Sequence, residues 1–331
     1  MSTPDTPSPY RAAARIEAID LARGFALLAM AVYHFTWDLE FFGYLDPGTT
    51  AVGGWKLFAR CIASSFLFLV GVSLYLAHGR GIRRGPLLRR LAMVGGAAAL
   101  ISIVTYLAVP QGFIFFGILH QIALASVLGL PFLRLPPLAT LVAAAIVIAG
   151  PHFLRAQMFD HPALWWLGLA PVNPRSNDYV PVFPWFGAVL IGIAAAKTAV
   201  ARGWMQRLGA LPQAVWQRPF VFCGRHSLAF YLIHQPVLIG LVWIATQVAP
   251  PPATRPQDGF VQACRVQCDA VRDAAFCEGY CGCMLESLEA DGLLDSLYSG
   301  KADDALQSRM EALAASCTES AEMPPSEGGT P

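Results

Sequence analysis

Long apolar runs alternate with short polar connections along the first 250 residues of the chain. A lipid bilayer requires about 20 mostly apolar residues per spanning helix, and seven segments meet this requirement. They lie at 18–40, 55–77, 91–109, 112–132, 137–154, 181–198 and 220–248. Several contain Gly or Pro, which membrane helices tolerate where neighbouring groups satisfy the freed backbone. The pattern predicts an all-α polytopic membrane protein with about seven transmembrane helices.

Composition supports this prediction. Hydrophobic residues make up 55% of the 331 residues and charged residues only 14%, whereas about a quarter of the residues of a soluble domain are charged. No basic stripe indicates nucleic-acid binding. The first apolar run carries charged residues and no convincing processing site, so we expect an uncleaved span rather than a signal peptide. Three regions follow: an N-terminal segment at 1–17, a transmembrane domain at 18–248 and a tail at 249–331.

Basic residues concentrate in alternate connections between the spans. Segment 78–90 carries five arginines and segment 197–219 four basic residues, whereas 41–54 and 155–180 together carry two. Cytoplasmic connections of membrane proteins are enriched in Lys and Arg. We therefore expect the N-terminus on the cytoplasmic side and the tail outside, in the inner (cytoplasmic) membrane of a bacterium.

The tail differs from the rest of the chain. From residue 250 it carries 14 acidic and 5 basic residues, and it ends in a Pro- and Gly-rich stretch that we expect to be disordered. It holds six of the eight cysteines: Cys264, Cys268, Cys277, Cys281, Cys283 and Cys317. The first four form two Cys-x3-Cys units, and on a helix each such pair shares one face. In an oxidising compartment, two disulfides could join two short helices. A metal site or free thiols are alternatives, although this tail contains no His.

Ionisable residues inside a span are costly and therefore mark functional sites. The first span carries four of them: Asp20, Arg23, His34 and Asp38. Arg23 and His34 share one helix face about 16 Å apart, and His34 and Asp38 are one turn apart. Arg23, with Asp20 beside it, suits an anionic cytoplasmic ligand, and His34 oriented by Asp38 suits a general base. Alternatively, Arg23 is an interfacial anchor and Asp38 a loop residue.

Further polar residues lie in later spans. We expect His120, Gln121, Tyr231 and His234 to line the same cavity, or to make structural hydrogen bonds between helices. Three intramembrane histidines also permit haem ligation, but none are paired at the spacing of a multi-haem bundle, and we predict no metal. Asp178, Tyr179 and Trp185 lie in or after the outer connection 155–180. They suit either an acceptor sugar or an interfacial aromatic belt.

Four sequence blocks resemble a known family. These are RIEAIDLARGFALLAMAVYHFTWDL (15–39), FGILH (116–120), DYVPVFPWFG (178–187) and SLAFYLIHQP (227–236). They are similar to bacterial members of the heparan-alpha-glucosaminide N-acetyltransferase catalytic-domain family. The spacing of Arg23 and His34 also resembles the first-helix motif of acyltransferase family 3. The tail lies outside the resemblance, and segment 41–54 lacks the first-loop His that we associate with the lysosomal family member.

The resemblance implies transfer of an acetyl group from cytosolic acetyl-CoA to a sugar amine or hydroxyl on the extracytoplasmic side. Arg23 would lie near the donor and His34 at the catalytic centre. Acetyl-CoA would be a co-substrate rather than a bound cofactor, the acceptor a glycan, and the surroundings a lipid bilayer. A homodimer is compatible with the sequence. The alternatives are a transporter or flippase for a polar glycan or lipid-linked substrate, and a scaffold that displays the tail.

Overall fold

The computed structural model describes residues 16–210, 214–252, 256–269, 271–298 and 304–322, and within these ranges every regular element is a helix. The all-α prediction is therefore confirmed for the described residues. Most of the expected cytoplasmic segment 1–17 and the C-terminal stretch expected to be disordered lie outside these ranges.

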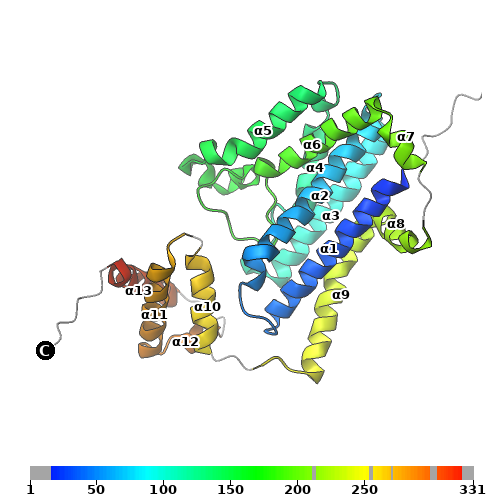
Figure 1. The fold of residues 1–331 in the computed structure, drawn as a ribbon. Helices are drawn as coiled ribbons and strands as arrows, with labels where there is room; N and C mark the ends of the chain where they lie inside the picture. Colours follow the sequence, from blue (N-terminus) through cyan, green and yellow to red (C-terminus); the bar gives the residue numbers. More distant parts are fainter. Residues whose placement is uncertain (1–15, 211–213, 253–255, 270, 299–303, 323–331) are drawn as a thin grey trace, which may run out of the picture. The chain divides into compact units, whose positions relative to one another are not determined.

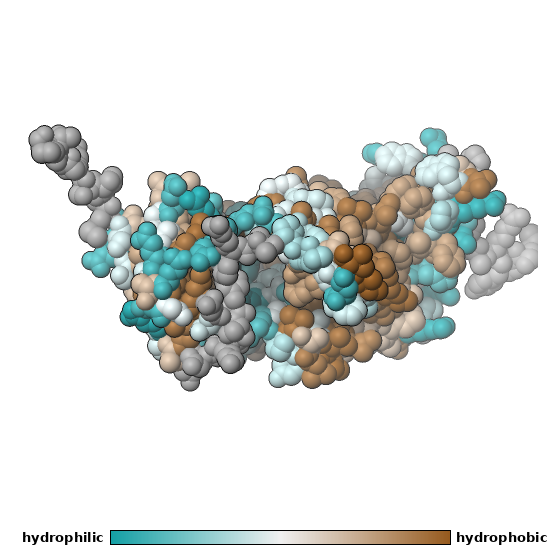
Figure 2. Space-filling view, turned by 90° about the horizontal axis from the view of Figure 1, so that it is seen from below, coloured by the Kyte–Doolittle hydropathy of each residue, from teal (hydrophilic) through white to brown (hydrophobic). Residues whose placement is uncertain are grey.

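Among the described residues, six helices are long and apolar enough to cross a membrane (Figure 1). They are α1 (Glu17–Phe41), α2 (Gly53–His78), α3 (Arg84–Ala108), α5 (Pro137–Leu154), α6 (Val182–Ala201) and α9 (Ser227–Val248). One face of the molecule carries a broad hydrophobic area (Figure 2), and these helices expose many large apolar side chains. Leu107, Phe153 and Val248, for example, are 75%, 82% and 83% exposed. Exposed apolar surface on six helices of spanning length is typical of contact with lipid, and the chain is a multi-pass integral membrane protein.

The fourth expected span differs from its prediction. A continuous helix over 112–132 is wrong: α4 (Ile118–Leu128) has 11 residues, about 16 Å, and is flanked by the short 3-10 turns η2 (Pro110–Gly112) and η3 (Pro131–Leu133). The helix begins at Ile118, where the backbone N–H donates to Asp178 Oδ2 and the preceding Gly117 has an extended backbone. A Cβ at Gly117 would stand 2.3 Å from Asp178 Oδ2.

The broken fourth segment nevertheless extends along the whole of α6. At one end, the Asn177 N–H, just before α6, donates to the Gly112 carbonyl over 2.9 Å. At the other end, Lys197 Nζ, near the end of α6, donates to the Phe132 carbonyl over 2.5 Å. Irregular backbone is tolerated within a membrane when protein groups satisfy it. The segment 112–132 therefore runs the length of α6, although only part of it is helical.

Close helix contacts fix the remaining elements. α5 and α6 form an antiparallel pair (Figure 1). The last expected span, 220–248, divides at His226 into α8 (Arg218–Arg225) and α9, and the short α7 (Trp204–Gly209) precedes them. α8 crosses α1 at two glycines: a Cβ at Gly24 would lie 2.1 Å from the Phe220 carbonyl oxygen, and one at Gly224 would lie 1.8 Å from that of Asp20. This crossing brings Arg225 beside the first turns of α1.

The described chain divides into two compact units, one of 1–31 with 59–234 and one of 32–58 with 235–331. The second unit contains the tail helices α10 (Pro256–Cys268), α11 (Ala274–Ala290), α12 (Leu294–Tyr298) and α13 (Asp304–Glu322). They enclose a hydrophobic core of their own that includes Met284, Leu288 and Leu313.

The expected disulfides are confirmed, and all six tail cysteines are paired. Cys264 bonds Cys281 and Cys268 bonds Cys277, which staples α10 to α11. This pairing follows from two antiparallel helices, because the outer cysteine of one Cys-x3-Cys unit then faces the outer cysteine of the other. The third disulfide, Cys283–Cys317, joins α11 to α13.

Candidate functional site

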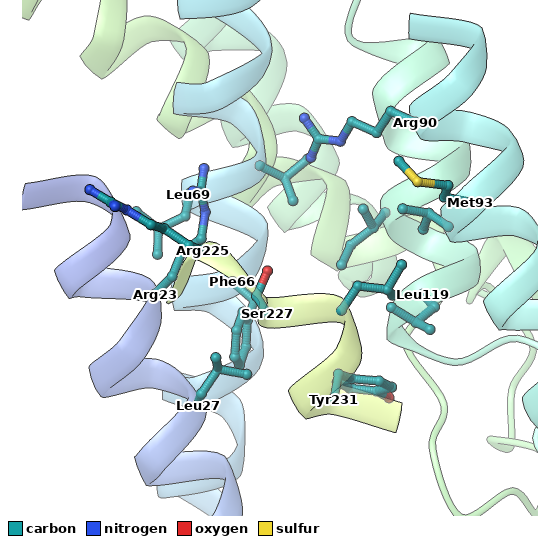
Figure 3. A pocket seen from close by; sticks show the side chains of 14 residues that line it. Arg23, Leu27, Phe66, Leu69, Arg90, Met93, Leu119, Arg225, Ser227 and Tyr231 are labelled. Carbon is teal, nitrogen blue, oxygen red and sulfur yellow. The ribbon is translucent and has the colours of Figure 1, made fainter. Parts of the chain in front are cut away.

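A pocket of about 390 Å³ opens in the first unit (Figure 3). Its lining comes from six helices and includes Arg23, Arg90, Arg225, Ser227, Tyr231 and several apolar side chains, among them Leu27, Phe66 and Leu119. The arginines lie at one end, and Leu27 and Tyr231 lie toward the other (Figure 3). Small-molecule sites have this size and mixed character. The pocket suits an amphipathic anion whose charged part meets the arginines.

Two of the arginines are held by carboxylates. Arg23 Nη1 bonds Asp20 Oδ1 over 2.7 Å, and Arg23 Nη2 donates to the hydroxyl of Ser73. Arg225 bonds Glu17 over 2.5 Å and lies 3.7 Å from Asp20. Asp20 is only 1% exposed. The Asp20 carboxylate therefore orients the guanidinium groups of Arg23 and Arg225. Its negative charge would repel a phosphate group, so Asp20 itself would not contact one.

Arg90 differs from the other two arginines. It is partly buried in α3, and its guanidinium extends toward the pocket (Figure 3). Within the described part of the chain, its side chain has no hydrogen bond or ion pair. A cation that is withdrawn from water without a partner is costly. This energetic cost is relieved when an anion occupies the pocket.

The apolar end of the pocket is joined to the connection between α5 and α6. The hydroxyl of Tyr231 donates to Asp178 Oδ2 over 3.5 Å, and the backbone N–H of Ile118 donates to the same oxygen over 2.8 Å. Asp178 therefore caps the positive end of α4. Burial raises the pKa of Asp178, although both hydrogen bonds oppose this rise. A single hydrogen bond, from Tyr231 to Asp178, thus links the apolar end of the pocket to the connection between α5 and α6.

His34 and Asp38 lie further along α1, in the second unit. His34 is half-buried and stacks edge-on with Tyr33, with 5.7 Å between ring centroids. Asp38 is fully buried. Its Oδ1 accepts a hydrogen bond from Gln235 Nε2 of α9 over 2.7 Å. The alternative that Asp38 lies in a loop beyond the span is wrong, because α1 continues to Phe41. The expected pairing of Asp38 with His34 stays a prediction.

The other expected cavity residues are distributed differently. Tyr231 lines the pocket, but among the described residues His120, Gln121 and His234 are not part of its lining. His120 accepts from the Gly117 N–H at Nδ1 and contacts Ser102 Oγ through Nε2, both at 3.2 Å. His120 thus supports the break before α4, as in the structural alternative. A role for these three residues in another cavity stays a prediction.

Tyr179 and Trp185 also stabilise the connection into α6. Tyr179 donates to the Trp165 carbonyl over 2.6 Å, and burial raises its pKa to about 12. Trp185 packs against the main hydrophobic core. These contacts favour an architectural role. Contact with an acceptor sugar is a prediction that no hydrogen bond of these residues tests.

Three residues of the site were not predicted from the sequence: Arg90, Arg225 and Gln235. Arg90 and Arg225 belong to basic segments that the positive-inside pattern already explains. Gln235 follows His234 and carries no charge that would mark it. Only the arrangement of the helices distinguishes them from their neighbours. Within the described ranges no group of three or more His, Cys, Asp or Glu side chains could hold a metal ion.

Comparison with known proteins adds the family. No curated protein and no solved structure matches the chain significantly. The family model for the catalytic region of heparan-alpha-glucosaminide N-acetyltransferase matches residues 15–236. The match covers α1 to the middle of α9, and so includes the arginine pocket as well as His34, Asp38 and Gln235. The chain therefore belongs to the heparan-alpha-glucosaminide N-acetyltransferase catalytic family of membrane acyltransferases.

Proposed function

We propose that this protein transfers an acetyl group from acetyl-CoA to an amine or hydroxyl of a sugar on the other side of a bacterial cytoplasmic membrane. The observation that carries the proposal is the arginine pocket, above all the guanidinium of Arg90, which has no hydrogen-bond or ion-pair partner among the described residues. Coenzyme A bears phosphates at one end and a thioester at the end of a long, largely uncharged arm. This distribution of charge matches a pocket with three arginines at one end and apolar side chains at the other.

The three arginines would bind the phosphates of the donor. Arginine presents a fork of N–H donors that matches phosphate oxygens. Asp20 would act indirectly, because it orients Arg23 and Arg225 through its carboxylate. The remaining positive charge comes from Arg90, whose charge no carboxylate among the described residues offsets. These arginines belong to the basic ends of α1, α3 and α8, which the positive-inside rule assigns to the cytoplasm.

His34 would act as the general base. It lies eleven residues after Arg23 on the same helix, about 16 Å along the axis, which the arm of coenzyme A can extend across. The acceptor oxygen or nitrogen would attack the thioester carbon while His34 takes its proton. The carbon–sulfur bond then breaks, and the thiolate receives the proton from His34. Asp38 would stabilise the imidazolium formed in between.

The link between the pocket and the α5–α6 connection supports transfer across the membrane. Tyr231 at the pocket floor contacts Asp178, whose connection is poor in basic residues and is expected outside. An acyl group at the floor would therefore have little protein between itself and the outer side. The acceptor would be a surface or periplasmic glycan.

Purified protein in lipid nanodiscs, incubated with acetyl-CoA carrying a labelled acetyl group and a panel of amino sugars and glycans, tests the proposal. We expect label on an acceptor from the wild type and a strongly reduced rate from His34→Ala. Binding of coenzyme A without label on any acceptor or on water would contradict the transferase assignment.

The break before α4 favours a second candidate, because interrupted helices near the membrane centre are typical of transporters. In that case the arginine pocket would bind an anion in transit. Uptake of an intact labelled phosphate-bearing compound into proteoliposomes, without acyl transfer, would support the transporter instead.

A further inference from the structure

Asp38 and Gln235 form a buried polar pair between α1 and α9. Asp38 is fully buried, and Gln235 Nε2 donates to its Oδ1 over 2.7 Å. Both residues belong to the second unit, as does His34 one turn before Asp38. The amide is uncharged, so it fixes one carboxylate oxygen without neutralising the negative charge. An Arg or Lys at position 235 would form an ion pair and offset that charge.

The two other side-chain oxygen atoms of this pair have no hydrogen-bond partner among the described residues. Asp38 Oδ2 and Gln235 Oε1 are buried and accept no hydrogen bond within the described part of the chain. Buried polar atoms in folded proteins almost always have a partner, so exceptions require an explanation. Inside a membrane helix the energetic cost of an open carboxylate oxygen is high, and such groups persist at functional sites. If the pair only held the two helices together, hydrogen bonds to these two oxygen atoms would make the protein more stable.

We propose that Gln235 is a positioning residue for the acyl transfer: it holds Asp38 by Oδ1 so that Oδ2 remains available to the imidazolium of His34. This inference rests on the proposed function. When one ring nitrogen of His34 takes the proton from the acceptor, the N–H of the other ring nitrogen donates to Oδ2, and the first nitrogen then passes its proton to the departing thiolate. Gln235 contacts neither donor nor acceptor, and it acts only through Asp38.

The alternative is a tie that merely holds α1 against α9. The two roles differ for Asp38→Asn. The Asn side-chain carbonyl can still accept from Gln235 Nε2, so a tie would leave both folding and rate near the wild-type values. A positioning role requires the negative charge, so Asp38→Asn should fold normally and react slowly.

The test measures acetyl transfer and melting temperature in nanodiscs for Gln235→Leu, Asp38→Asn and the double variant. Gln247→Leu is the matched control, because Gln247 lies on the same helix and is exposed. We expect Gln235→Leu to lower kcat about tenfold or more, since a hydrogen bond to a charged group is lost, with KM for acetyl-CoA within about twofold of the wild-type value. The double variant should be no slower than Asp38→Asn alone.

Three outcomes would overturn the inference: a wild-type kcat in Gln235→Leu, a wild-type kcat in Asp38→Asn, or independent losses that multiply in the double variant. If Gln235→Leu does not reach the membrane, Gln235→Asn replaces it, because its shorter amide cannot reach Asp38, and the same criteria apply. A wild-type protein that transfers no acetyl group would refute the proposed function itself. An active wild type with unaffected variants refutes only the role of Gln235.

Discussion

Arg23, Arg90 and Arg225 share one pocket but differ in what offsets their charge. Asp20 contacts both Arg23 and Arg225, and these two arginines are therefore oriented before any ligand arrives. Arg90 has no such partner among the described residues. At the residue scale, Arg23 and Arg225 are therefore preorganised for a ligand, whereas the charge of Arg90 would be stabilised by the ligand itself.

Arg90→Leu should therefore weaken donor binding without destabilising the empty protein. We expect KM for acetyl-CoA to rise about tenfold or more, because a charged hydrogen bond to the donor is lost. The melting temperature without donor should stay equal or rise, since an unpaired charge is removed from a partly buried site. Arg89→Leu, on the exposed side of the same helix, is the control. An unchanged KM in Arg90→Leu would refute its role in donor binding.

His34→Ala tests the base directly. Loss of general-base assistance should lower kcat about 100- to 10,000-fold, while the protein still inserts because the span becomes more apolar. Wild-type turnover in His34→Ala would exclude His34 as the base.

Arg23→Ala should instead raise KM for acetyl-CoA more than it lowers kcat, because the change removes binding energy that is equal in the ground state and the transition state. Equal losses for both variants with poor membrane yield would indicate structural roles.

At the scale of elements, close backbone contacts position the site. α8 meets α1 at Gly24 and Gly224, where any Cβ would overlap a backbone oxygen of the other helix. This contact brings Arg225 within reach of Glu17 and Asp20. The break before α4 has a similar effect, because it allows Asp178 to reach both Ile118 and Tyr231.

Gly24→Ala and Gly224→Ala should separate the two helices. Because a backbone oxygen cannot move aside as a flexible side chain does, we expect each to destabilise the protein by about 1–3 kcal/mol. They should also raise KM for acetyl-CoA, since Arg225 moves with α8. Gly95→Ala, in α3 with nothing within 4 Å of the added atom, should leave both quantities unchanged or slightly stabilise the helix. Thermal melting in detergent measures the first effect. Equal melting temperatures for all three variants would contradict the close-contact account.

At the scale of the whole molecule, the number of crossings decides which residues share a side of the membrane. Six long helices alone would place the N-terminus and the tail on one side. We expect the broken fourth segment to add a seventh crossing, because its two ends contact opposite ends of α6. The odd number agrees with the distribution of arginines and with three disulfides in the tail, since disulfides persist in oxidising compartments.

Reporter fusions test this topology. Fusions in 80–90 and 200–218 should report a cytoplasmic location, and fusions in 155–178 and 260–317 an external one. A cytoplasmic signal from a fusion near 260 would show that the fourth segment does not cross.

Thiol labelling tests the tail. In denatured protein the six tail cysteines should stay unreactive until a reductant is added, whereas Cys61 and Cys223, which are free, should react at once. Prompt labelling of the tail without reductant would contradict the disulfides.

Deletion of 257–331 should leave acetyl transfer intact, because the arginine pocket and His34 lie before residue 236. Loss of turnover after the deletion, with normal insertion, would show that the tail takes part in catalysis.

The sequence by itself determined the membrane class, six of the seven expected spans, the family and the disulfide-rich tail. These features follow from local composition and spacing. The length of an apolar run shows whether a helix can cross the bilayer, and two cysteines at i and i+4 share a face in any helix. It also predicted Arg23, His34 and Asp38 as candidate site residues, because an ionisable group within an apolar run is visible without its neighbours.

Only the tertiary structure decided the break in the fourth segment, the pairing of the cysteines and the partners of the charged groups. The break depends on Asp178, which is 60 residues from Ile118 in sequence. Gln235 contacts Asp38 across 197 residues, and Arg90 is distinguished from Arg89 only by the direction it faces. Hydropathy and periodicity report on residues a few positions apart. They cannot reveal which distant side chain satisfies, or leaves open, a buried polar group.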